Sequence, residues 1–246
     1  MLATLDKPIF VDLDAPRARF FDEHTNRGAA ALNRAAFIEA SVFTITLFGG
    51  PGCGKTTLLR ETLKRLGAGL RVGVVVCNIR AEDDAARVRP LCDQAIGIEA
   101  VELTPALLHE AMERIDLSRL DVLFIERGAG SAPHAVDLGQ NATVGVFSAC
   151  GGDDKAHRYA DRIEHADLVL VTKSDLLPFI GFSRTAFRNA VREVNAGARV
   201  IELSCTGSSE AGLNEWCNWV RDHVHRPTGK PNETLKVDWS ADYFVG

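Results

Sequence analysis

The sequence predicts a three-layer α/β fold, with a mostly parallel central sheet and helices on both of its faces. Short, almost continuously apolar segments such as 42–49, 71–77 and 121–126 alternate with segments that have a helical pattern. Strands that are apolar along their whole length are typical of parallel sheets buried on both faces. A length of 246 residues, 46% of them hydrophobic, suits one large domain with an ample core.

The N-terminal half begins with an alanine-rich segment, about 25–40, that predicts a helix with Leu32, Ala36 and Ala40 on one side. Residues 42–49 are β-branched and aromatic and end at glycines, as expected of a buried strand. Residues 55–66 then predict a helix whose inward-facing side chains are Leu58, Leu59, Leu63 and Leu66.

The remaining elements repeat this alternation. Thr104 is the expected N-cap, and Pro105 the first-turn residue, of a helix over 105–114. Apolar segments predict strands at 71–77, 121–126, 143–149, 167–173 and 198–204, with a further short strand at 100–103. Further helices are predicted at 83–91, near 158–165 and at about 212–223.

The ends of the chain differ in composition from this region. We expect an N-terminal extension at 1–24, one domain at 25–225 and a polar tail at 226–246. The aromatic residues between Trp239 and Phe244 make the tail either a docking peptide or a disordered end.

Charge and cysteine usage exclude several classes of protein. The net charge is -5 and Lys and Arg are scattered, which argues against a nucleic-acid partner. No apolar run reaches the ~18 residues of a membrane span, and the first residues do not resemble a secretory signal. The six cysteines form no C-x-x-C pair and are expected to be free thiols. We therefore expect a cytoplasmic protein with no membrane partner.

A glycine-rich segment between the strand at 42–49 and the helix at 55–66 fits the pattern G-x-x-x-x-G-K-[ST]. Glycines let backbone N–H groups converge on phosphate oxygens, and the helix N-terminus adds partial positive charge. Lys55 would then bridge the β- and γ-phosphates, and Thr56 would give its hydroxyl to Mg²⁺. The expected phosphate-binding residues are Gly49, Gly50, Gly52, Cys53, Gly54, Lys55, Thr56 and Thr57. This motif makes the fold that of a P-loop NTPase.

Acidic residues follow two of the other strands. Glu126 ends the strand at 121–126, where a P-loop sheet holds Mg²⁺ through water, and the glycines 128 and 130 suit a backbone that moves against a γ-phosphate. Asp83 or Asp84 follows the strand at 71–77, where a first switch loop is expected. Acids at a helix N-terminus are equally explained as capping. Lys55, Asp84 and Glu126 are the predicted catalytic residues, and Thr56, Asp84 and Glu126 the predicted Mg²⁺ site.

The segment 172–175, TKSD, follows the strand at 167–173. Asp175 is positioned there to accept hydrogen bonds from the N1–H and 2-amino groups of guanine, which adenine does not offer, while the Lys173 stem packs along the base. Ser204 and Cys205, after the next strand, are expected to support the base from the adjoining loop.

These segments together resemble the HypB family of GTPases, nickel-insertion accessory proteins of hydrogenase maturation, with the UreG proteins of urease maturation as relatives. The resemblance runs from about residue 31 to 220. It is carried by LNRAAF, FGGPGCGKTTLL, DDAARVR, DVLFIE, VDLGQ, GGDDKAHRYAD, VLVTKSDLLPF, LSCTG and GLNEWCNWV. The run from GGDDK to the tyrosine, with its spacing from VDLGQ, is the most specific part.

The resemblance implies a GTP-dependent homodimer with slow intrinsic GTP hydrolysis and Mg²⁺, which gates metal delivery to an apo-enzyme. Its implied partners are a metalloenzyme client or a HypA-like metallochaperone. The sequence departs from the family's usual pattern at Asn78, where Asp is usual, at Ala81, where Thr is usual, and at Thr172, where Asn begins the base-reading motif.

The largest departure concerns the transition metal. Positions that carry a Cys-His pair and a Cys-Pro in the family are Thr104, Pro105, Ala132 and Pro133 here. Thr, Pro and Ala do not replace thiolate or imidazole ligands. The family's metal site is therefore not carried over, and nickel or zinc binding is left open. Other cysteines and histidines are weaker candidates, of which His134 is the one worth testing; the others are Cys92, His109, Cys150 and His157.

Two alternatives compete with a GTPase that assists metal insertion. A P-loop kinase for a small molecule would need arginines over the phosphates, for which Arg80, Arg87 and Arg127 are candidates. A non-hydrolysing interaction protein would use nucleotide only to dimerise. Lys155, in the GGDDK segment, is the candidate for a nucleotide-responsive dimer contact, although a solvated lysine in an acidic loop explains it almost as well.

Overall fold

The computed structural model describes residues 23–128, 136–206 and 210–224. These residues contain a seven-stranded sheet in the order β3-β2-β4-β1-β5-β6-β7. Every pair of neighbouring strands is parallel, which confirms the predicted fold class. The strands are β1 Phe43–Phe48, β2 Val72–Asn78, β3 Gln94–Glu99, β4 Val122–Arg127, β5 Ala142–Ser148, β6 Leu168–Thr172 and β7 Arg199–Glu202.

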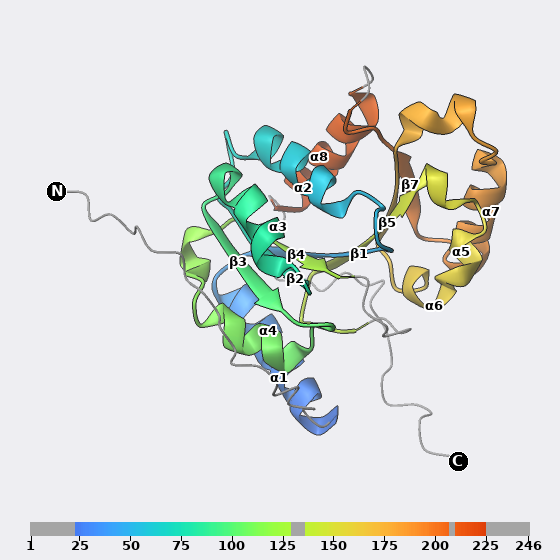
Figure 1. Cartoon of the computed structure of the whole chain (residues 1–246). Helices are drawn as coiled ribbons and strands as arrows, with labels where there is room; N and C mark the ends of the chain where they lie inside the picture. The colour runs from blue at the N-terminus through green and yellow to red at the C-terminus, as the bar shows by residue number, and fades with distance from the viewer. Residues whose placement is uncertain (1–22, 129–135, 207–209, 225–246) are drawn as a thin grey trace, which may run out of the picture.

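Helices cover both faces of the sheet, which makes three layers (Figure 1). On one face α2, α3 and α8 share a core with side chains of β1, β2, β4, β5 and β6. On the other face α1 and α4 pack beside β2 and β4, and α5, α6 and α7 beside β5 and β6. The helices are α1 Glu23–Glu39, α2 Lys55–Leu66, α3 Ala81–Val88, α4 Pro105–Met112, α5 Lys155–Arg158, α6 Ala160–Ile163, α7 Arg184–Val194 and α8 Ala211–Val224.

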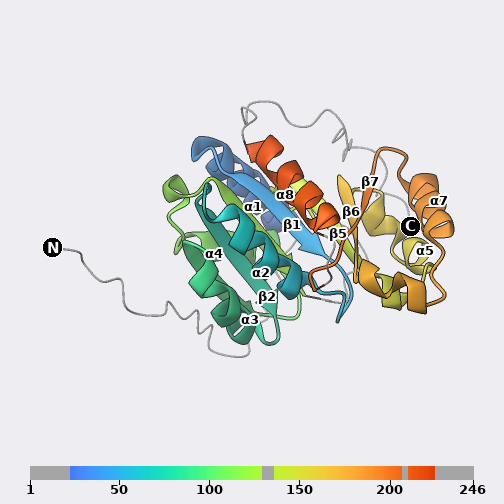
Figure 2. The same ribbon diagram turned by 90° about the horizontal axis from the view of Figure 1, so that it is seen from above.

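The central strand β1 lies between β4 and β5, and the chain leaves its carboxyl end through the glycine-rich loop into α2 (Figure 2). Strands numbered later lie on both sides of β1, so the order reverses at this strand. In open parallel sheets, ligands bind at the carboxyl ends of the strands beside such a reversal. The topology therefore directs the search for a site to the carboxyl ends of β1, β2, β4 and β6.

The strand predicted at 100–103 is wrong, because the chain forms β3 at Gln94–Glu99 instead. Gly97 lets this strand approach α3 closely: a Cβ there would lie 2.9 Å from the Ala81 carbonyl carbon. The helix α7 was not predicted. Its buried residues are only Phe187, Ala190 and Val191, and charged side chains cover the rest. Helix α4 begins as predicted, with the Thr104 hydroxyl accepting from Leu107 N–H.

The predicted inward side of α1 is wrong by one position. Leu32 is 57% exposed, whereas Asn33 and Phe37 are buried. Asn33 is a polar residue on the buried face, which hides it from a search for apolar periodicity. Its side-chain amide donates to the carbonyls of Pro105 and Leu138 at 3.0 and 3.1 Å, and its oxygen lies 2.9 Å from His109 Nδ1.

The VDLGQ segment packs against this same part of α1. Asp137 accepts two hydrogen bonds from the Arg34 guanidinium, at 2.7 and 2.9 Å. Gly139 has φ 88°, and a Cβ there would lie 2.7 Å from the Ala30 carbonyl oxygen. Only glycine fits such a contact without a shift of the helix. The LNRAAF and VDLGQ segments, far apart in the sequence, therefore pack directly against each other.

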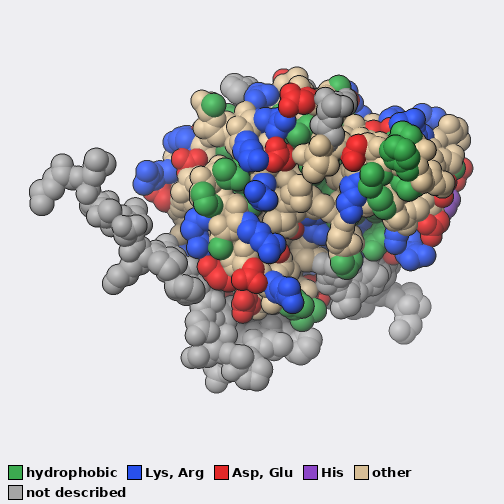
Figure 3. Space-filling model, turned by 45° about the horizontal axis from the view of Figure 1, so that its top comes forward, with side chains coloured by type: hydrophobic (Ala, Val, Ile, Leu, Met, Phe, Trp, Pro, Cys, Tyr) green, Lys and Arg blue, Asp and Glu red, His purple; other side chains and the backbone are tan. Residues whose placement is uncertain are grey.

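Two observations concern the surface. Acidic and basic side chains are interspersed over the face drawn in Figure 3. None of the helices in the described segments has the length and apolar character needed to cross a membrane. The expected N-terminal extension lies outside the described residues except for Glu23 and His24, which belong to α1, and the expected tail at 226–246 lies outside them entirely.

Candidate nucleotide site

The phosphate loop closes around the Lys55 side chain. Lys55 is 8% exposed, and its ammonium donates to the carbonyls of Gly49 and Gly50 at 2.9 and 3.3 Å. Gly52 and Gly54 have φ values of 68° and 94°, in the left-handed region that glycine adopts without strain. The loop therefore holds one positive charge at the N-terminus of α2, where the helix dipole also favours an anion.

The floor of the loop is tied to β5 and β6. Thr172 is 2% exposed, and its hydroxyl donates to the Cys53 carbonyl at 2.6 Å, with the Phe147 carbonyl 3.2 Å away. Cys53 is 5% exposed, and burial raises the pKa of its thiol, so its Sγ is a neutral packing group. The threonine that departs from the family's usual residue therefore acts as a fixed link between the phosphate loop and the strand before TKSD.

Thr56 and Glu126 meet beside the loop. The Thr56 hydroxyl donates to the Glu126 carboxylate, 3.0 Å from one oxygen and 3.4 Å from the other. Asp84 approaches from α3, close enough to raise the pKa of Glu126. Its carboxylate accepts from the Asn78 amide at 3.1 Å and pairs with Arg87 at 3.0 Å. The structure thus brings the three predicted Mg²⁺ residues together.

Glu126 lies in a strongly desolvated position at the end of β4, 3% exposed. Burial raises the pKa of its carboxyl to about 7, and Asp84 adds to this, while Lys55 and the Thr56 hydrogen bond oppose it. A buried carboxylate beside a second acid is stabilised by a cation. This side of the site therefore has the oxygen ligands and the charge deficit that suit a hard divalent cation.

The TKSD segment, which is predicted to read the base, lies next to the phosphate loop. Lys173 adopts φ 58°, and its ammonium donates to the Gly52 carbonyl at 2.9 Å. Asp175 accepts a hydrogen bond from the Ser204 hydroxyl at 2.5 Å, which joins the two predicted base loops. Cys205 is partly buried, and burial raises the pKa of its thiol to about 11. The Ser204 hydroxyl, from the loop after β7, therefore orients the Asp175 carboxylate.

Some predicted residues fall outside this arrangement. Asp83 is exposed, so Asp84 is the acid of the pair that faces Glu126. Thr57 is exposed in the first turn of α2. Ala132, Pro133 and His134 lie outside the described residues, as do Gly130 and Gly207.

The thiols and imidazoles proposed as replacement metal ligands do not come together. His109 is bound to Asn33, and burial raises the pKa of Cys92 to about 12. Cys150 and His157 are exposed. Within residues 23–128, 136–206 and 210–224, no group of three or more His, Cys, Asp or Glu side chains is arranged to hold a metal ion.

Tyr159 is a neighbour of the phosphate loop that the sequence did not single out. A Cβ on Gly50 would lie 3.2 Å from the Tyr159 hydroxyl, and Lys155 Nζ lies 6.0 Å from the centre of the tyrosine ring. The tyrosine ends the GGDDKAHRY run, so its place in that motif was the available signal. The Lys155 segment is therefore joined to the phosphate loop through Tyr159.

Comparison with known proteins agrees with this geometry. A family model described as "CobW/HypB/UreG, nucleotide-binding domain" matches residues 43–202, from the first residue of β1 to the last of β7. This chain belongs to the CobW/HypB/UreG family. The match contains the phosphate loop, Asp84, Glu126 and the TKSD segment, whereas Ser204 and Cys205 lie just beyond its end.

Within this family the chain is similar to hydrogenase maturation factors named HypB. It is 36% identical over 200 residues to HypB of Azotobacter vinelandii, covering 78% of this chain and 64% of that protein. It is 35% identical over 199 residues to HypB of Escherichia coli K12, covering 79% and 68%. The chain thus spans about two thirds of the length of these relatives. The crystal structure of HypB from Archaeoglobus fulgidus superposes with a TM-score of 0.73 at 26% identity, covering 81% of this chain and 98% of that one.

Proposed function

We propose that this chain is a GTP-binding and GTP-hydrolysing accessory protein that assists metal insertion into a metalloenzyme, with nickel as the expected metal. It works as a nucleotide-gated dimer, with a metalloenzyme client or a HypA-like metallochaperone as partner. The domain that does this is 25–225. The similarity to HypB proteins of two bacteria supports the class of process, and the contact between Thr56 and Glu126 beside Lys55 is the observation that carries the nucleotide chemistry.

Mg²⁺ fits this position because the donors present are hard oxygens. Thr56, Glu126 and Asp84 would hold it, directly or through water, and the bound ion would neutralise charge on the transferring phosphate. Their chemistry supports the fit: two carboxylates and a hydroxyl converge, and one carboxyl has a pKa raised to about 7 by burial.

Hydrolysis then depends on what the chain's own groups do at fixed atoms. The Lys55 ammonium binds phosphate oxygens and offsets their negative charge, while the loop N–H groups orient the phosphate chain. Ionised Glu126 accepts the hydrogen bond of Thr56 and so orients the Thr56 hydroxyl beside the phosphate. Because the loop is anchored by Thr172, little reorganisation accompanies binding.

Guanine selectivity is assigned to Asp175. Its carboxylate is acceptor-only, and guanine offers two adjacent donors where adenine offers none. The hydrogen bond from Ser204 orients Asp175, and Lys173 covers the base from the side of Gly52. A site that pairs buried donors and acceptors with one base rejects the other strongly, because polar groups would be left without partners.

The Asp175→Asn substitution tests this assignment, because it replaces a hydrogen-bond acceptor of the side chain by a donor. Wild-type protein with Mg²⁺ is titrated calorimetrically with GDP, ADP and xanthosine diphosphate, and Asp175→Asn is titrated in parallel. We expect wild type to prefer GDP over ADP at least ~100-fold. The variant should lose GDP and gain xanthosine diphosphate, whose C2 carbonyl accepts from the Asn amide. Asp153→Asn, in the acidic loop before α5, is the matched control. Equal affinity of wild type for GDP and ADP would remove Asp175 from the base site.

The dimer and the metal need separate measurements. Sedimentation with GDP and with a non-hydrolysable GTP analogue should detect dimer only with the analogue, and Lys55→Ala should remove it. Nickel and zinc titrations of both nucleotide forms then distinguish a metal carrier from a protein that acts by docking. Stoichiometric nickel binding in one nucleotide form identifies a carrier, and its absence in both identifies a docking switch.

The kinase alternative lacks a supporting observation among the described residues. Arg87 pairs with Asp84 at 3.0 Å, and Arg127 points to the face of the sheet opposite Glu126. Incubation with labelled GTP and a cell extract separates the two: a phosphorylated small product supports a kinase, and free phosphate alone supports the GTPase.

A further inference from the structure

The hydroxyl of Tyr159 lies against the second glycine of the phosphate loop. A Cβ on Gly50 would lie 3.2 Å from this oxygen, and, apart from Gly50 and its chain neighbours, no other heavy atom of the described residues would come within 4 Å of it. Within residues 23–128, 136–206 and 210–224 the hydroxyl forms no hydrogen bond. Tyr159 therefore has a hydrogen-bond donor beside the loop that is available to a ligand.

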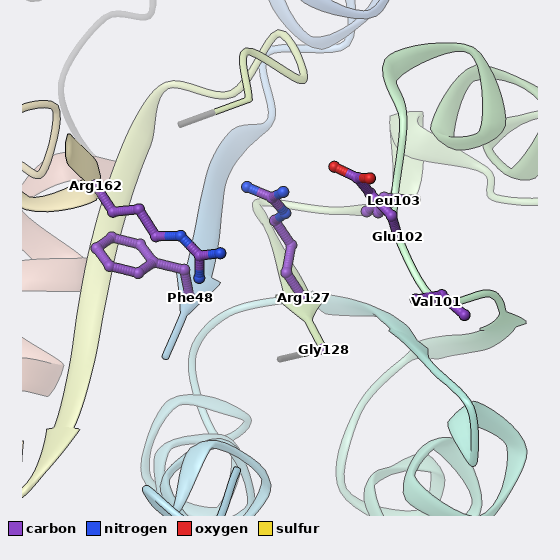
Figure 4. A pocket seen from close by; sticks show the side chains of 7 residues that line it. All are labelled: Phe48, Val101, Glu102, Leu103, Arg127, Gly128 and Arg162. Carbon is purple, nitrogen blue, oxygen red and sulfur yellow. The ribbon is translucent and has the colours of Figure 1, made fainter. Parts of the chain in front are cut away.

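The tyrosine ring is held in place by its neighbours. Tyr159 lies between α5 and α6 with φ -114° and ψ 26°, outside the α-helical region, so the chain turns there. Its ring packs edge to face on that of Phe147 in β5, with 5.6 Å between the centroids. The guanidinium carbon of Arg162 lies 5.6 Å from the ring centre, and Arg162 also lines the small pocket drawn in Figure 4. These contacts keep the hydroxyl at one place on the loop.

This place is on the side of the loop where the terminal phosphate is expected. In a phosphate loop, backbone N–H groups and the helix N-terminus bind the α- and β-phosphates, and the lysine reaches the β- and γ-phosphates. The Lys55 ammonium lies 3.3 Å from the Gly50 carbonyl oxygen. We therefore expect the γ-phosphate to lie closer to Gly50 than the α- and β-phosphates do.

We propose that Tyr159 determines the preference of the site for a triphosphate, by donating a hydrogen bond to a γ-phosphate oxygen. This oxygen is anionic, and hydrogen bonds to charged acceptors are stronger than those between neutral groups. A nucleoside diphosphate has no oxygen at this position, so the hydrogen bond forms with GTP alone. The assignment rests on the proposed guanine-nucleotide binding and adds one residue to it.

The same contact joins the terminal phosphate to the segment of Lys155. The Tyr159 N–H donates to the Lys155 carbonyl at 3.0 Å, and Lys155 Nζ lies 6.0 Å from the centre of the tyrosine ring. A hydrogen bond from Tyr159 to the γ-phosphate therefore orders the backbone that carries the candidate dimer contact. A GTP analogue should protect the amides of residues 155–159 from hydrogen exchange more than GDP does. Equal protection by the two nucleotides contradicts the γ-phosphate contact.

The main test compares two nucleotides with one substitution. Wild type and Tyr159→Phe, both with Mg²⁺, are titrated calorimetrically with GDP and with a non-hydrolysable GTP analogue. Tyr159→Phe should weaken binding of the analogue about tenfold, because a charge-assisted hydrogen bond is lost, and leave the GDP affinity within about twofold. Ser118→Ala removes an exposed hydroxyl before the amino end of β4 and should change neither affinity.

Failure of this assignment differs from failure of the proposed function. Equal weakening of both nucleotides, or an unchanged affinity for the analogue, would overturn the role of Tyr159. The GDP affinity of wild type would still support the proposed function in either case. A wild-type protein that bound neither nucleotide would contradict both.

A second substitution tests the contact itself, without nucleotide. Gly50→Ala should lower the urea midpoint of the wild-type protein, because the new Cβ presses on the Tyr159 hydroxyl. It should not lower the midpoint of Tyr159→Phe, in which the Cβ has open space, so the two substitutions should not be additive. Equal changes in the two backgrounds would show that the hydroxyl does not lie on the loop, and would overturn the proposal.

Discussion

Glu126 and Arg127 are consecutive residues at the end of one strand, yet they lie in opposite electrostatic environments. Glu126 faces α2, accepts a hydrogen bond from Thr56 and is attracted electrostatically by Lys55. Arg127 faces the opposite side of the sheet, where burial and Arg162 lower the pKa of its guanidinium while Glu102 raises it. The alternation of side chains along a strand thus separates two opposite charges onto two faces within one residue.

The comparison shows that consecutive residues at one strand end can lie in opposite charge environments. On the Glu126 face a buried carboxylate accepts from the Thr56 hydroxyl and lies close to Asp84, and these oxygen donors suit a divalent cation. On the Arg127 face a partly buried guanidinium group is repelled by Arg162 and attracted by Glu102. Each prediction below perturbs one side.

The largest effect is expected from Lys55→Ala. This substitution removes charge-assisted hydrogen bonds to two phosphates, each worth about 1.5–3 kcal/mol, so affinity for GDP and GTP should fall at least ~100-fold. Calorimetry or a fluorescent analogue measures it. Lys64→Ala, an exposed residue of the same helix paired with Glu61, is the control. An effect below threefold would mean that Lys55 does not contact phosphate.

Glu126→Gln should change activity and stability in opposite directions. Hydrolysis should slow about 10- to 100-fold, because a metal-orienting carboxylate is lost. The folded pKa of about 7 exceeds the unfolded value of 4.5. The protonated acid therefore favours the fold below pH 4.5, and this stabilisation is lost as the pH rises through 7. Without Mg²⁺, the neutral amide should raise the free energy of unfolding at pH 8 by about 2–3 kcal/mol.

Urea titrations at pH 5 and pH 8 measure this gain, which should fall to below about 1 kcal/mol at the lower pH. Glu99→Gln, at the exposed end of β3, is the matched control and should leave both the hydrolysis rate and the stability unchanged. A Glu126→Gln protein that is less stable than wild type at pH 8 would contradict the assignment of a desolvated charge.

The affinity for Mg²⁺ should depend on pH through Glu126. Because burial raises the pKa of this carboxyl to about 7, protonation competes with the cation below neutrality. We expect Mg²⁺ affinity in the GDP complex to be about tenfold weaker at pH 6 than at pH 8. In Glu126→Gln the affinity should be weaker throughout and flat over this range. A wild-type profile without a step between pH 6 and pH 8 would show that another group dominates.

The smallest effect is expected on the arginine side. Arg127→Met keeps most of the packing volume and removes a charge that burial and Arg162 disfavour. The free energy of unfolding should rise by about 1 kcal/mol. Arg60→Met should stay within about 0.5 kcal/mol of wild type. A loss of stability in Arg127→Met under these conditions would mean that the guanidinium has a stabilising partner.

Much of the architecture was predictable because it depends on patterns of residues that are close together in the sequence. The strands β1, β2, β4, β5 and β6 are short apolar runs, and the phosphate loop combines glycines with a lysine at fixed spacing. The periodicity of apolar residues gave a wrong or missing prediction where a buried residue is polar, or where a helix buries only a few residues. Asn33 is inside and Leu32 outside on α1, and α7 buries so few residues that its helix went unrecognised.

The residues of the candidate site likewise fall into those that were predicted from the sequence and those that only the structure revealed. Lys55, Thr56, Glu126 and Asp175 were identified from motifs that lie directly after strands. Asp84 was also predicted from the sequence, and its approach to Glu126, together with the exposure of Asp83, agrees with that choice. The role of Thr172 needed its contact with the Cys53 carbonyl. Tyr159 and Arg162 come from a segment far along the chain from both Gly50 and Arg127, so no local pattern announces their proximity.

By itself, the sequence determined the fold class, the phosphate loop and the order of the acidic and base-reading elements. These features depend on residue spacing along one or two neighbouring elements, which periodicity and turn chemistry encode. Only the tertiary structure decided which face each strand-end side chain takes and which charges are left without a partner. Charge balance is a sum over residues from several elements, and it exists only once the sheet has brought their ends together.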